Sequence, residues 1–381
     1  MASANLQPKT AKTVVPVWPQ TVRPYAVSTV DIVSASQAAT VNIPQVKINT
    51  NWPKGNMIYR RLILRLVGHM DIAVASGNAL TAASQFAAKL IKSLFFRTSN
   101  FQYLITGVDG LTLYRMLSRQ LSTQLYSLDL ASVAAGGSNT ADEFEVVLDI
   151  PFQAPDALRP EDLGLDMVMA GNPELTINFQ LPSSLVSISG SGNTLNLNDL
   201  TLYVSVEVVE NPNPATSLPT HKILLDSVQM PVTATGSEQL MNPELPYNDR
   251  IYRALLLAQR DMTTLAELAD TIIGVNDADK VSFKLNNDTI WDSINWLQEE
   301  HRQGSCYGTA VLGPGQMFLD FVRKTTHGAR IGDMVDVETN IPGNLKLYMD
   351  LTKPSGNPYI IAGIDAIQSL GAKQIRPANL G

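Results

Sequence analysis

The chain has 381 residues, of which 45% are hydrophobic and 17% charged, and its net charge at neutral pH is −7. This is the composition of an ordinary folded protein, and no apolar run reaches the roughly 18 residues that a membrane-spanning helix requires, so disordered and membrane-spanning classes are excluded. The length predicts about two domains, and the single cysteine, Cys306, excludes an internal disulfide.

The first 45 residues are rich in proline and show no sustained strand or helix periodicity. Proline lacks an amide donor and interrupts helices and central strands. We therefore predict an extended N-terminal arm over residues 1–45. Its apolar side chains, which include Trp18 and Tyr25, indicate that it packs on a neighbouring subunit or along its own domain.

The first half beyond the arm is predicted to be mostly strands, because β-branched and aromatic residues dominate it and polar turns separate them. Two segments show helical spacing of apolar residues instead, residues 79–92 and 111–126. The predicted strands cover residues 46–50, 57–67, 94–97, 101–105, 144–150, 175–180 and 200–209.

A clear break follows these strands. Residues 210–214 are Glu-Asn-Pro-Asn-Pro, and two successive Asn-Pro pairs cannot continue a strand or a helix. We place a domain boundary here, which gives a first domain over residues 46–212 and a second domain, with a basic C-terminal tail, over residues 213–381.

The second half repeats the plan of the first. Residues 57–64, Met-Ile-Tyr-Arg-Arg-Leu-Ile-Leu, return at 250–257 as Arg-Ile-Tyr-Arg-Ala-Leu-Leu-Leu, and the elements after each copy match in order. A short helix is predicted around residues 266–272, and a helix over 289–303 takes the place of 111–126. The predicted strands cover residues 221–228, 250–257, 281–285, 316–323, 345–351 and 359–367.

Strands without crossover helices between them form antiparallel sandwiches. Each half exceeds the roughly 100 residues of an immunoglobulin-like sandwich and carries a helix in mid-domain, which favours the jelly roll. The predicted fold class is all-β, with two tandem eight-stranded jelly-roll β-sandwiches, short helices in loops and the extended N-terminal arm.

A tandem of two jelly rolls, each with a helix-bearing loop, joined by a proline-rich connector and preceded by an arm, resembles the double jelly-roll major capsid proteins of the adenovirus and tectivirus lineage. The resemblance spans nearly the whole chain and rests on architecture and length. The family has no diagnostic motif to match residue by residue, so no binding residue is carried over.

The resemblance implies a structural protein, not an enzyme, that stands upright in an icosahedral shell of a virus or bacteriophage. It would form homotrimeric, pseudo-hexagonal capsomers that contact neighbouring capsomers, vertex or minor capsid proteins and, in many members, an internal lipid membrane. It implies a location in the virion, with assembly in the host cytoplasm, and no sequence-specific binding of nucleic acid.

Both ends of the chain are basic although the whole is acidic. Residues 1–30 and 371–381 contain no acidic residue. We expect these ends to contact an anionic partner, either lipid headgroups or the genome; the alternative is that scattered charges on loose termini have no role. The basic residues are Lys9, Lys12, Arg23, Lys373 and Arg376.

The residue pattern shows no catalytic or metal-binding motif. The histidines His69, His221, His301 and His327 lack the spacing of a metal site, so neither a metal nor a cofactor is predicted. Residues 276–279, Asn-Asp-Ala-Asp, lack the glycine and distal glutamate of a helix-loop-helix calcium site, and we interpret them as a turn.

Two other function classes stay open at this stage. The same layered architecture occurs in carbohydrate-binding and carbohydrate-active sandwich proteins, in which the positions of the acidic residues come from the fold and not from their spacing. A viral spike or fibre protein is the other alternative. The duplicated plan and the lack of a secretion-signal pattern at the N-terminus favour the shell subunit.

Overall fold

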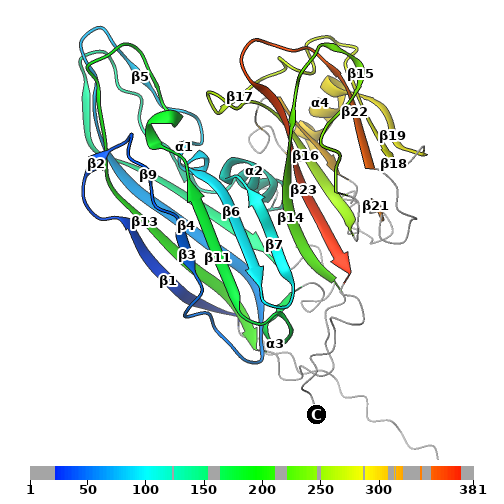
Figure 1. Ribbon diagram of the computed structural model, residues 1–381, viewed down its shortest axis with the longest axis horizontal. Helices are drawn as coiled ribbons and strands as arrows, with labels where there is room; N and C mark the ends of the chain where they lie inside the picture. The colour runs from blue at the N-terminus through cyan, green and yellow to red at the C-terminus, as the bar shows by residue number, and fades with distance from the viewer. Residues whose placement is uncertain are drawn as a thin grey trace, which may run out of the picture.

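The structure, a computed structural model, describes most of the chain. The described residues are 22–121, 124–152, 164–210, 221–246, 250–285, 288–307, 313, 315–320, 335–336 and 345–369. They form two β-sandwiches that stand side by side, with the strands of both running roughly upright in the view of Figure 1.

The first sandwich is a jelly roll. One layer has the strand order β1-β13-β4-β9 and the other β7-β6-β11-β3. Consecutive strands switch between the layers, except that β6 and β7 form a hairpin, which is the jelly-roll path. The strands are β1 (Arg23–Val33), β3 (Val46–Ile48), β4 (Met57–Ala73), β6 (Ile91–Thr98), β7 (Gln102–Val108), β9 (Ser138–Pro151), β11 (Pro173–Phe179) and β13 (Thr194–Glu210).

The second sandwich follows the same path. Its layers have the orders β14-β23-β16-β20 and β15-β22-β18-β19, so each strand has a counterpart at the same place in the first sandwich. The predicted double jelly roll is confirmed. The strands are β14 (His221–Pro231), β15 (Gly236–Leu240), β16 (Ile251–Asp261), β18 (Lys280–Leu285), β19 (Asp288–Asn295), β20 (Gln316–Asp320), β22 (Leu345–Leu351) and β23 (Pro358–Ser369).

The two longest helices occupy matching links. Helix α2 (Gly110–Leu121) lies between β7 and β9, and α4 (Trp296–Tyr307) lies between the corresponding strands β19 and β20. The sequence prediction of a helix in this link of both halves is confirmed. The short elements are β2 (Gln37–Ala38), β5 (Leu80–Thr81), α1 (Phe86–Lys89), β8 (Ser127–Leu128), β10 (Leu165–Asp166), α3 (Met167–Ala170), η1 (Pro182–Leu185), β12 (Ser187–Ile188), β17 (Ala266–Glu267) and β21 (Val335–Asp336).

The repeated octets occupy equivalent strands, β4 and β16. The hydroxyl of Tyr59 donates to the carbonyl of Pro53 at 2.6 Å, and the hydroxyl of Tyr252 donates to the carbonyl of Pro246, also six residues earlier. The pairing register shifts at Arg60 in β4 and at Arg253 in β16, so each arginine is the extra residue of a bulge. The tyrosine and the arginine of each octet therefore hold equivalent places in the two sandwiches.

The equivalent strands differ in how they are covered. In β4, buried side chains alternate with side chains that are half-buried or exposed, whereas every residue of β16 is buried. Ala254 and Ala258 of β16 stand where β4 has the half-exposed Arg61 and the exposed Arg65. A strand buried on both faces keeps a charge on its outer face only where a partner neutralises it, as Asp109 does for Arg260, so the repeat diverges where the burial differs.

The outer face of β16 is covered by the first sandwich. Strands β7 and β14 pair in parallel and join one layer of each sandwich into a single sheet. Helix α2 lies over β16 and β23 so closely that a Cβ at Gly363 would stand 2.7 Å from the sulfur of Met116. Side chains of the second sandwich that join the hydrophobic cluster of the first are Ile223, Leu225, Ile251, Leu256, Phe318 and Ile367. We call this contact the seam.

The predicted arm is wrong for part of its range. Residues 23–33 are not an extended arm but strand β1, which pairs antiparallel with β13. Strand β1 is the edge of its sheet, and an edge tolerates Pro24 because one side of the strand needs no amide donor. Residues 1–21 lie outside the described residues, and so does the proposed boundary at 212, between β13 and β14.

Three helix predictions are wrong wholly or in part. Only Phe86–Lys89 of residues 79–92 are helical, in the single turn α1, because Leu80–Thr81 form β5 and β6 begins at Ile91. Tertiary context here overrides the helix propensity of the alanines. Residues 288–295 form strand β19, so the second long helix begins at Trp296. The segment predicted as a short helix around residue 266 is the two-residue strand β17 followed by turns.

We predict that the seam stabilises the chain more than the equivalent outer face of β4 does. Leu256 is 1% exposed. The change Leu256→Ala should lower the free energy of unfolding by roughly 2–5 kcal/mol, because a cavity opens between the sandwiches. Ile63 holds the same place in β4 but is half-buried, so Ile63→Ala should cost less than half as much. Denaturant unfolding of both variants measures this, and equal losses would contradict the assignment of the seam.

Candidate functional site

One of the five predicted site residues is described. Arg23 is the first residue of β1 and its side chain is exposed. Lys9, Lys12, Lys373 and Arg376 lie outside the described residues. The contact of these residues with an anionic partner stays a prediction.

The described ends of the chain lie at one end of the molecule. Arg23 pairs with Val208 near the end of β13, and the last residue of β23, Ser369, pairs with the first residue of β14, His221. Figure 1 shows these strand ends at the lower end of the two sandwiches, where α3 also lies. We call this end the base. Both basic segments therefore leave the described fold from the base.

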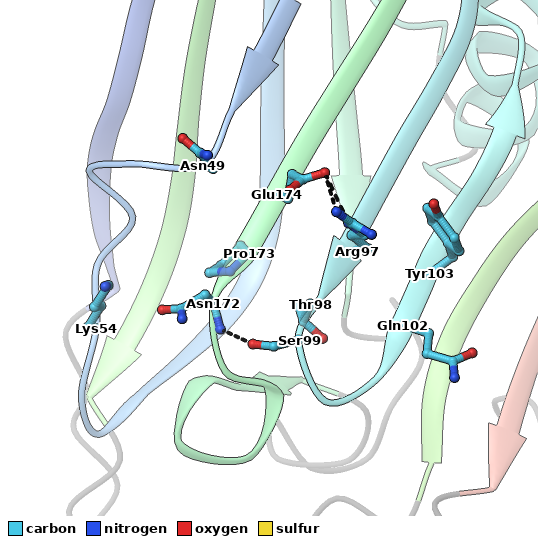
Figure 2. A pocket seen from close by; sticks show the side chains of 10 residues that line it. All are labelled: Asn49, Lys54, Arg97, Thr98, Ser99, Gln102, Tyr103, Asn172, Pro173 and Glu174. Carbon is cyan, nitrogen blue, oxygen red and sulfur yellow. Dashed lines mark hydrogen bonds and ion pairs between the residues drawn. The ribbon is translucent and has the colours of Figure 1, made fainter.

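A polar cleft of about 640 Å³ opens at the base of the first sandwich, around the turn between β6 and β7 (Figure 2). The amide of Asn172 donates to the hydroxyl of Ser99 at 2.7 Å and ties the start of β11 to this turn. Figure 2 shows Lys54 on the loop before β4, at one side of the cleft. The lining residues are Asn49, Lys54, Arg97, Thr98, Ser99, Gln102, Tyr103, Asn172, Pro173 and Glu174.

The charges inside this cleft pair with one another. Arg97 donates to Glu174 from Nε at 3.0 Å and from Nη2 at 2.8 Å, and the ammonium of Lys47 lies 3.2 Å from the same carboxylate. The hydrogen bond from Arg97 is the main cause that holds the pKa of Glu174 below its usual range. The guanidinium of Arg97 also lies over the ring of Tyr103, 5.9 Å from its centroid. Glu174 is therefore ionised and forms salt bridges to two neighbouring strands, so it is not a free acid or base.

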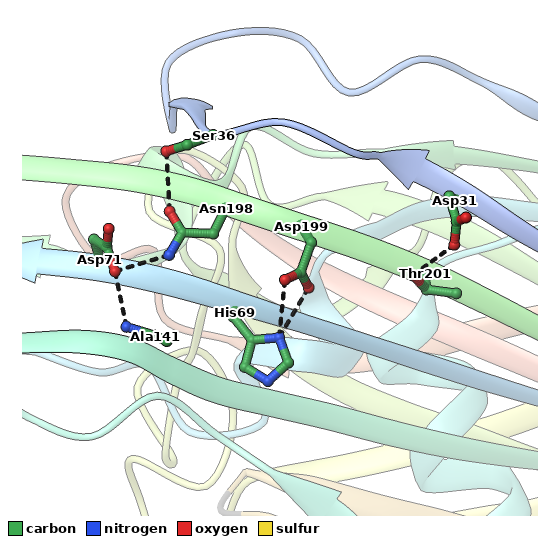
Figure 3. Close-up of polar contacts among 8 residues, drawn as sticks. All are labelled: Asp31, Ser36, His69, Asp71, Ala141, Asn198, Asp199 and Thr201. Atoms are coloured by element: carbon green, nitrogen blue, oxygen red, sulfur yellow. Dashed lines mark hydrogen bonds and ion pairs between the residues drawn. The ribbon is translucent and has the colours of Figure 1, made fainter.

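The outer face of the layer β1-β13-β4-β9 is polar and faces away from the second sandwich. Nδ1 of His69 lies 2.9 Å from Oδ1 of Asp199, and Asn198 donates to Asp71 at 2.8 Å (Figure 3). The amide of Ala141 donates to the same carboxylate and is the main cause that lowers the pKa of Asp71. The pairs join neighbouring strands, and in the described part of the chain no hydroxyl or thiol hydrogen-bonds His69 to complete a nucleophilic triad.

The seam holds a second group of charges, and these are buried. Nη2 of Arg253 donates to Asp365 at 2.9 Å, and Nη1 of Arg119 from α2 lies 3.9 Å from the same carboxylate, which is 2% exposed. Arg115, four residues earlier on α2, donates to Glu267 of the second sandwich at 3.3 Å. Breaking a buried pair leaves an uncompensated charge, which costs about 3–5 kcal/mol. The pairs that Arg115 and Arg119 of α2 make with the second sandwich therefore fix how the two sandwiches fit together.

Two further seam groups have shifted pKa values. Burial alone would raise the pKa of Asp109, but the charge of Arg260 and the hydrogen bonds from Thr112 and Arg260 hold it below its usual value. Burial lowers the pKa of Lys222 to about 8, with Arg250 adding to the effect, although its ammonium donates to the carbonyl of Phe101. Both groups join the sandwiches through polar contacts that are shielded from water.

The seam was not predicted, but the sequence contains a signal for it. Arg115 and Arg119 are four residues apart on one helix face, so they point to the same side of α2. Two arginines on the apolar-spaced helix of a sandwich indicate buried acidic partners elsewhere. The partners, Glu267 and Asp365, are far away in sequence and could not be identified from spacing.

The described residues contain no group of three or more His, Cys, Asp and Glu side chains that could hold a metal ion. Asp279, from the segment weighed as a calcium site, accepts hydrogen bonds from the amides of Gly274 and Asn276 at 3.0 and 3.1 Å, as a turn residue does. Across the part of the chain that the structure covers, no helix is long and apolar enough to cross a membrane.

Comparison with known proteins finds similarity in structure only. No family model matches the sequence, and no curated protein matches it. The STIV major capsid protein superposes with a TM-score of 0.62 at 15% identity, over 91% of this chain and 96% of that protein. STIV is Sulfolobus turreted icosahedral virus.

Two further solved structures show the same similarity. The Faustovirus major capsid protein gives a TM-score of 0.59 at 9% identity, covering 94% of this chain and 92% of that one. The major capsid protein P2 of bacteriophage PM2 gives 0.51 at 12% identity, covering 91% and 98%. The chain thus shares the double jelly-roll fold of viral major capsid proteins over nearly its whole length.

Proposed function

We propose that this protein is the major structural subunit of an icosahedral viral shell and that three copies associate into a pseudo-hexagonal capsomer. The observation that carries the proposal is the duplication: two sandwiches with the same strand order stand side by side in one chain. Three such chains present six similar units around a threefold axis, which fits a hexagonal lattice position. The three solved structures compared above, which share this fold over most of their length, are viral major capsid proteins.

The seam supports this role mechanically. A chain whose two sandwiches occupy two adjacent positions of a six-unit ring needs a fixed angle between those sandwiches. The shared sheet through β7 and β14, the packing of α2 on β16 and β23, and the buried pair of Arg115 with Glu267 hold that angle. A rigid two-sandwich unit can bury a large interface without first losing conformational entropy.

We propose that the base faces the interior of the particle. Arg23 is at the base, and both basic segments leave the fold there, so their positive charges would meet lipid headgroups or the genome. The polar cleft of Figure 2 also opens at the base. Vertex or minor capsid proteins and neighbouring capsomers would contact the remaining surfaces.

A carbohydrate-binding role has less support. The polar cleft contains Tyr103, whose ring is a natural platform for a sugar, but the guanidinium of Arg97 lies over that ring. Glu174 is held by Arg97 and Lys47 and does not serve as a catalytic acid. The cleft is therefore better explained as a charged surface at the base of a shell subunit.

The purified protein should be a trimer that persists on dilution, because six-unit capsomers require three chains with large obligate interfaces. Light scattering coupled to size-exclusion chromatography, across micromolar concentrations, measures the mass. A mass of one 41.4 kDa chain at every concentration would overturn the proposed capsomer.

The basic ends should bind anionic surfaces. Changing Lys373 and Arg376 to glutamine should weaken binding to phosphatidylglycerol vesicles by about tenfold or more, because each basic residue near an anionic membrane contributes roughly 1 kcal/mol. The matched control changes two exposed lysines elsewhere, Lys280 and Lys353, to glutamine. Vesicle and double-stranded DNA binding are measured separately to decide between lipid and genome. Equal binding by both variants to both partners would contradict the role of the basic ends.

A further inference from the structure

The seam is built from elements that occur a second time at the two outer sides of the same chain. In the seam, α2 of the first sandwich lies on the outer face of β16 and β23 of the second. Because both sandwiches have the same strand order, α4 is the counterpart of α2, and β4 and β13 are the counterparts of β16 and β23. Figure 1 shows α4 on the right of the molecule and β4 and β13 on the left, so these counterparts do not contact each other within one chain.

The strand edges repeat in the same way. Strands β7 and β14 meet edge to edge in the seam, and their counterparts are β19 and β1. In the described part of the chain, both counterparts are the outermost strands of their layers. An edge strand carries backbone amide and carbonyl groups that can pair with a strand of another chain. One side of the chain therefore offers α4 and the edge of β19, and the other offers the edge of β1 and the outer face of β4 and β13.

Helices α2 and α4 can be aligned residue by residue. Each has twelve residues, and we match them from their first positions. Leu113 of α2 then matches Glu299 of α4, and Leu117 matches Gln303. All four side chains are buried. The agreement in burial supports the alignment and shows that the two helices turn the same face inward.

The opposite faces of the two helices differ in exposure. Thr112 and Met116 of α2 lie against the second sandwich and are 0% and 2% exposed. The matching residues of α4 are Gln298 and Arg302, and both are exposed. The face of α4 that corresponds to the seam face of α2 is therefore uncovered in the single chain.

The sheet face on the other side of the chain has room for a helix. In the seam, Leu256 pairs with Gly363, and a Cβ at Gly363 would stand 2.8 Å from Cγ2 of Thr112. The matching pair in the first sandwich is Ile63 with Ser205. The side chain of serine is small, so a helix can approach β13 at Ser205, slightly farther out than α2 stands from Gly363.

This sheet face carries an excess of negative charge beside Ser205. Arg61 of β4 bonds Asp149 of β9 at 2.8 Å and lies 3.2 Å from Glu207 of β13. Two carboxylates thus share one guanidinium, which leaves one negative charge of this group unbalanced. In the seam, the buried Phe318 stands at the place of Asp149.

The helix face carries the complementary charge, because Arg302 of α4 stands at the place of Met116 of α2. Arg302 pairs with Glu299 of its own helix, but its guanidinium has five donors and its side chain is 55% exposed, so it can also meet a carboxylate of another chain. The two apolar residues of the seam, Met116 and Phe318, are thus replaced on the two outer faces by side chains of opposite charge. Opposite charges on two surfaces favour their association and fix its register.

We propose that the outer face of α4 in one chain packs on the outer face of β4 and β13 in a second copy, with Gln298 and Arg302 next to Ser205 and its neighbouring carboxylates. The contact repeats the arrangement of the seam between chains, and three such contacts close a ring of six sandwiches. It rests on the trimer of the proposed function and assigns the surfaces that form it. Exposed charges are screened by salt, so high salt should separate the chains before it opens the seam.

Cysteine cross-linking of the full-length protein tests this contact. The chain's own Cys306 is changed to serine, and Gln298→Cys is then combined with Ser205→Cys. The matching side chains of the seam come within contact distance, so the two new thiols should form a disulfide under mild oxidation. The two positions lie on opposite sides of one chain, so the disulfide joins different chains, and the main product should be a reducible covalent trimer.

The matched control combines Gln298→Cys with Thr176→Cys. Thr176 is half-buried on the outer face of β11, in the other layer of the same sandwich, and this pair should give no covalent trimer. As a second measurement, Ser205→Trp should lower the mass in solution from three chains to one chain of 41.4 kDa, because the indole blocks the approach of α4. Thr176→Trp should stay a trimer, which controls for the effect of a tryptophan on an outer sheet face.

The outcomes separate this contact from the proposed function. If the unchanged protein is a trimer, cross-linking of the Gln298 and Ser205 pair no greater than that of the control pair, or an unchanged mass for Ser205→Trp, would overturn the contact and leave the shell subunit in place. An unchanged protein that is a monomer at every concentration would overturn both.

Discussion

The burial of the second sandwich against the first is the contact on which the rest of the structure depends. Leu256 on the outer face of β16 packs into the hydrophobic cluster of the first sandwich, and Gly363 of β23 lets α2 approach without a Cβ in between. The arginines of α2 then meet Asp365 and Glu267 in a setting from which water is removed. The second sandwich could not keep this apolar face in water, so the two halves form one folding unit.

The two halves show how a duplicated unit adapts to unequal surroundings. Inside each sandwich the plan is kept, since the tyrosine hydroxyl still bonds a proline carbonyl and the arginine bulge stays in the same strand position. Outside, the polar pairs of β4, such as Arg65 with Glu145 at 2.5 Å, give way to the alanines of β16. Interior contacts depend on the fold alone, whereas outer faces depend on their neighbours.

Long strands with a strong hydrophobic pattern could be predicted from the sequence, whereas an edge strand could not. The β-rich runs at β4, β13, β16 and β23 led to the double jelly roll, which is confirmed. Strand β1 was missed because prolines suit an edge as well as an arm, and α1 was overpredicted because alanines fill a core as readily as a helix. The seam brings together residues more than a hundred positions apart, such as Asp109 and Arg260, which no local pattern can reveal.

A rigid pair of equivalent sandwiches suits a subunit that must fill two positions of a hexagonal lattice. The seam fixes their relative position, and both basic segments leave the described fold at the base. Negative-stain electron microscopy of the purified protein tests this most directly. Threefold particles with six similar lobes around a centre are expected, and a field of separate two-lobed particles, with no threefold assembly at any concentration, would contradict the proposed capsomer.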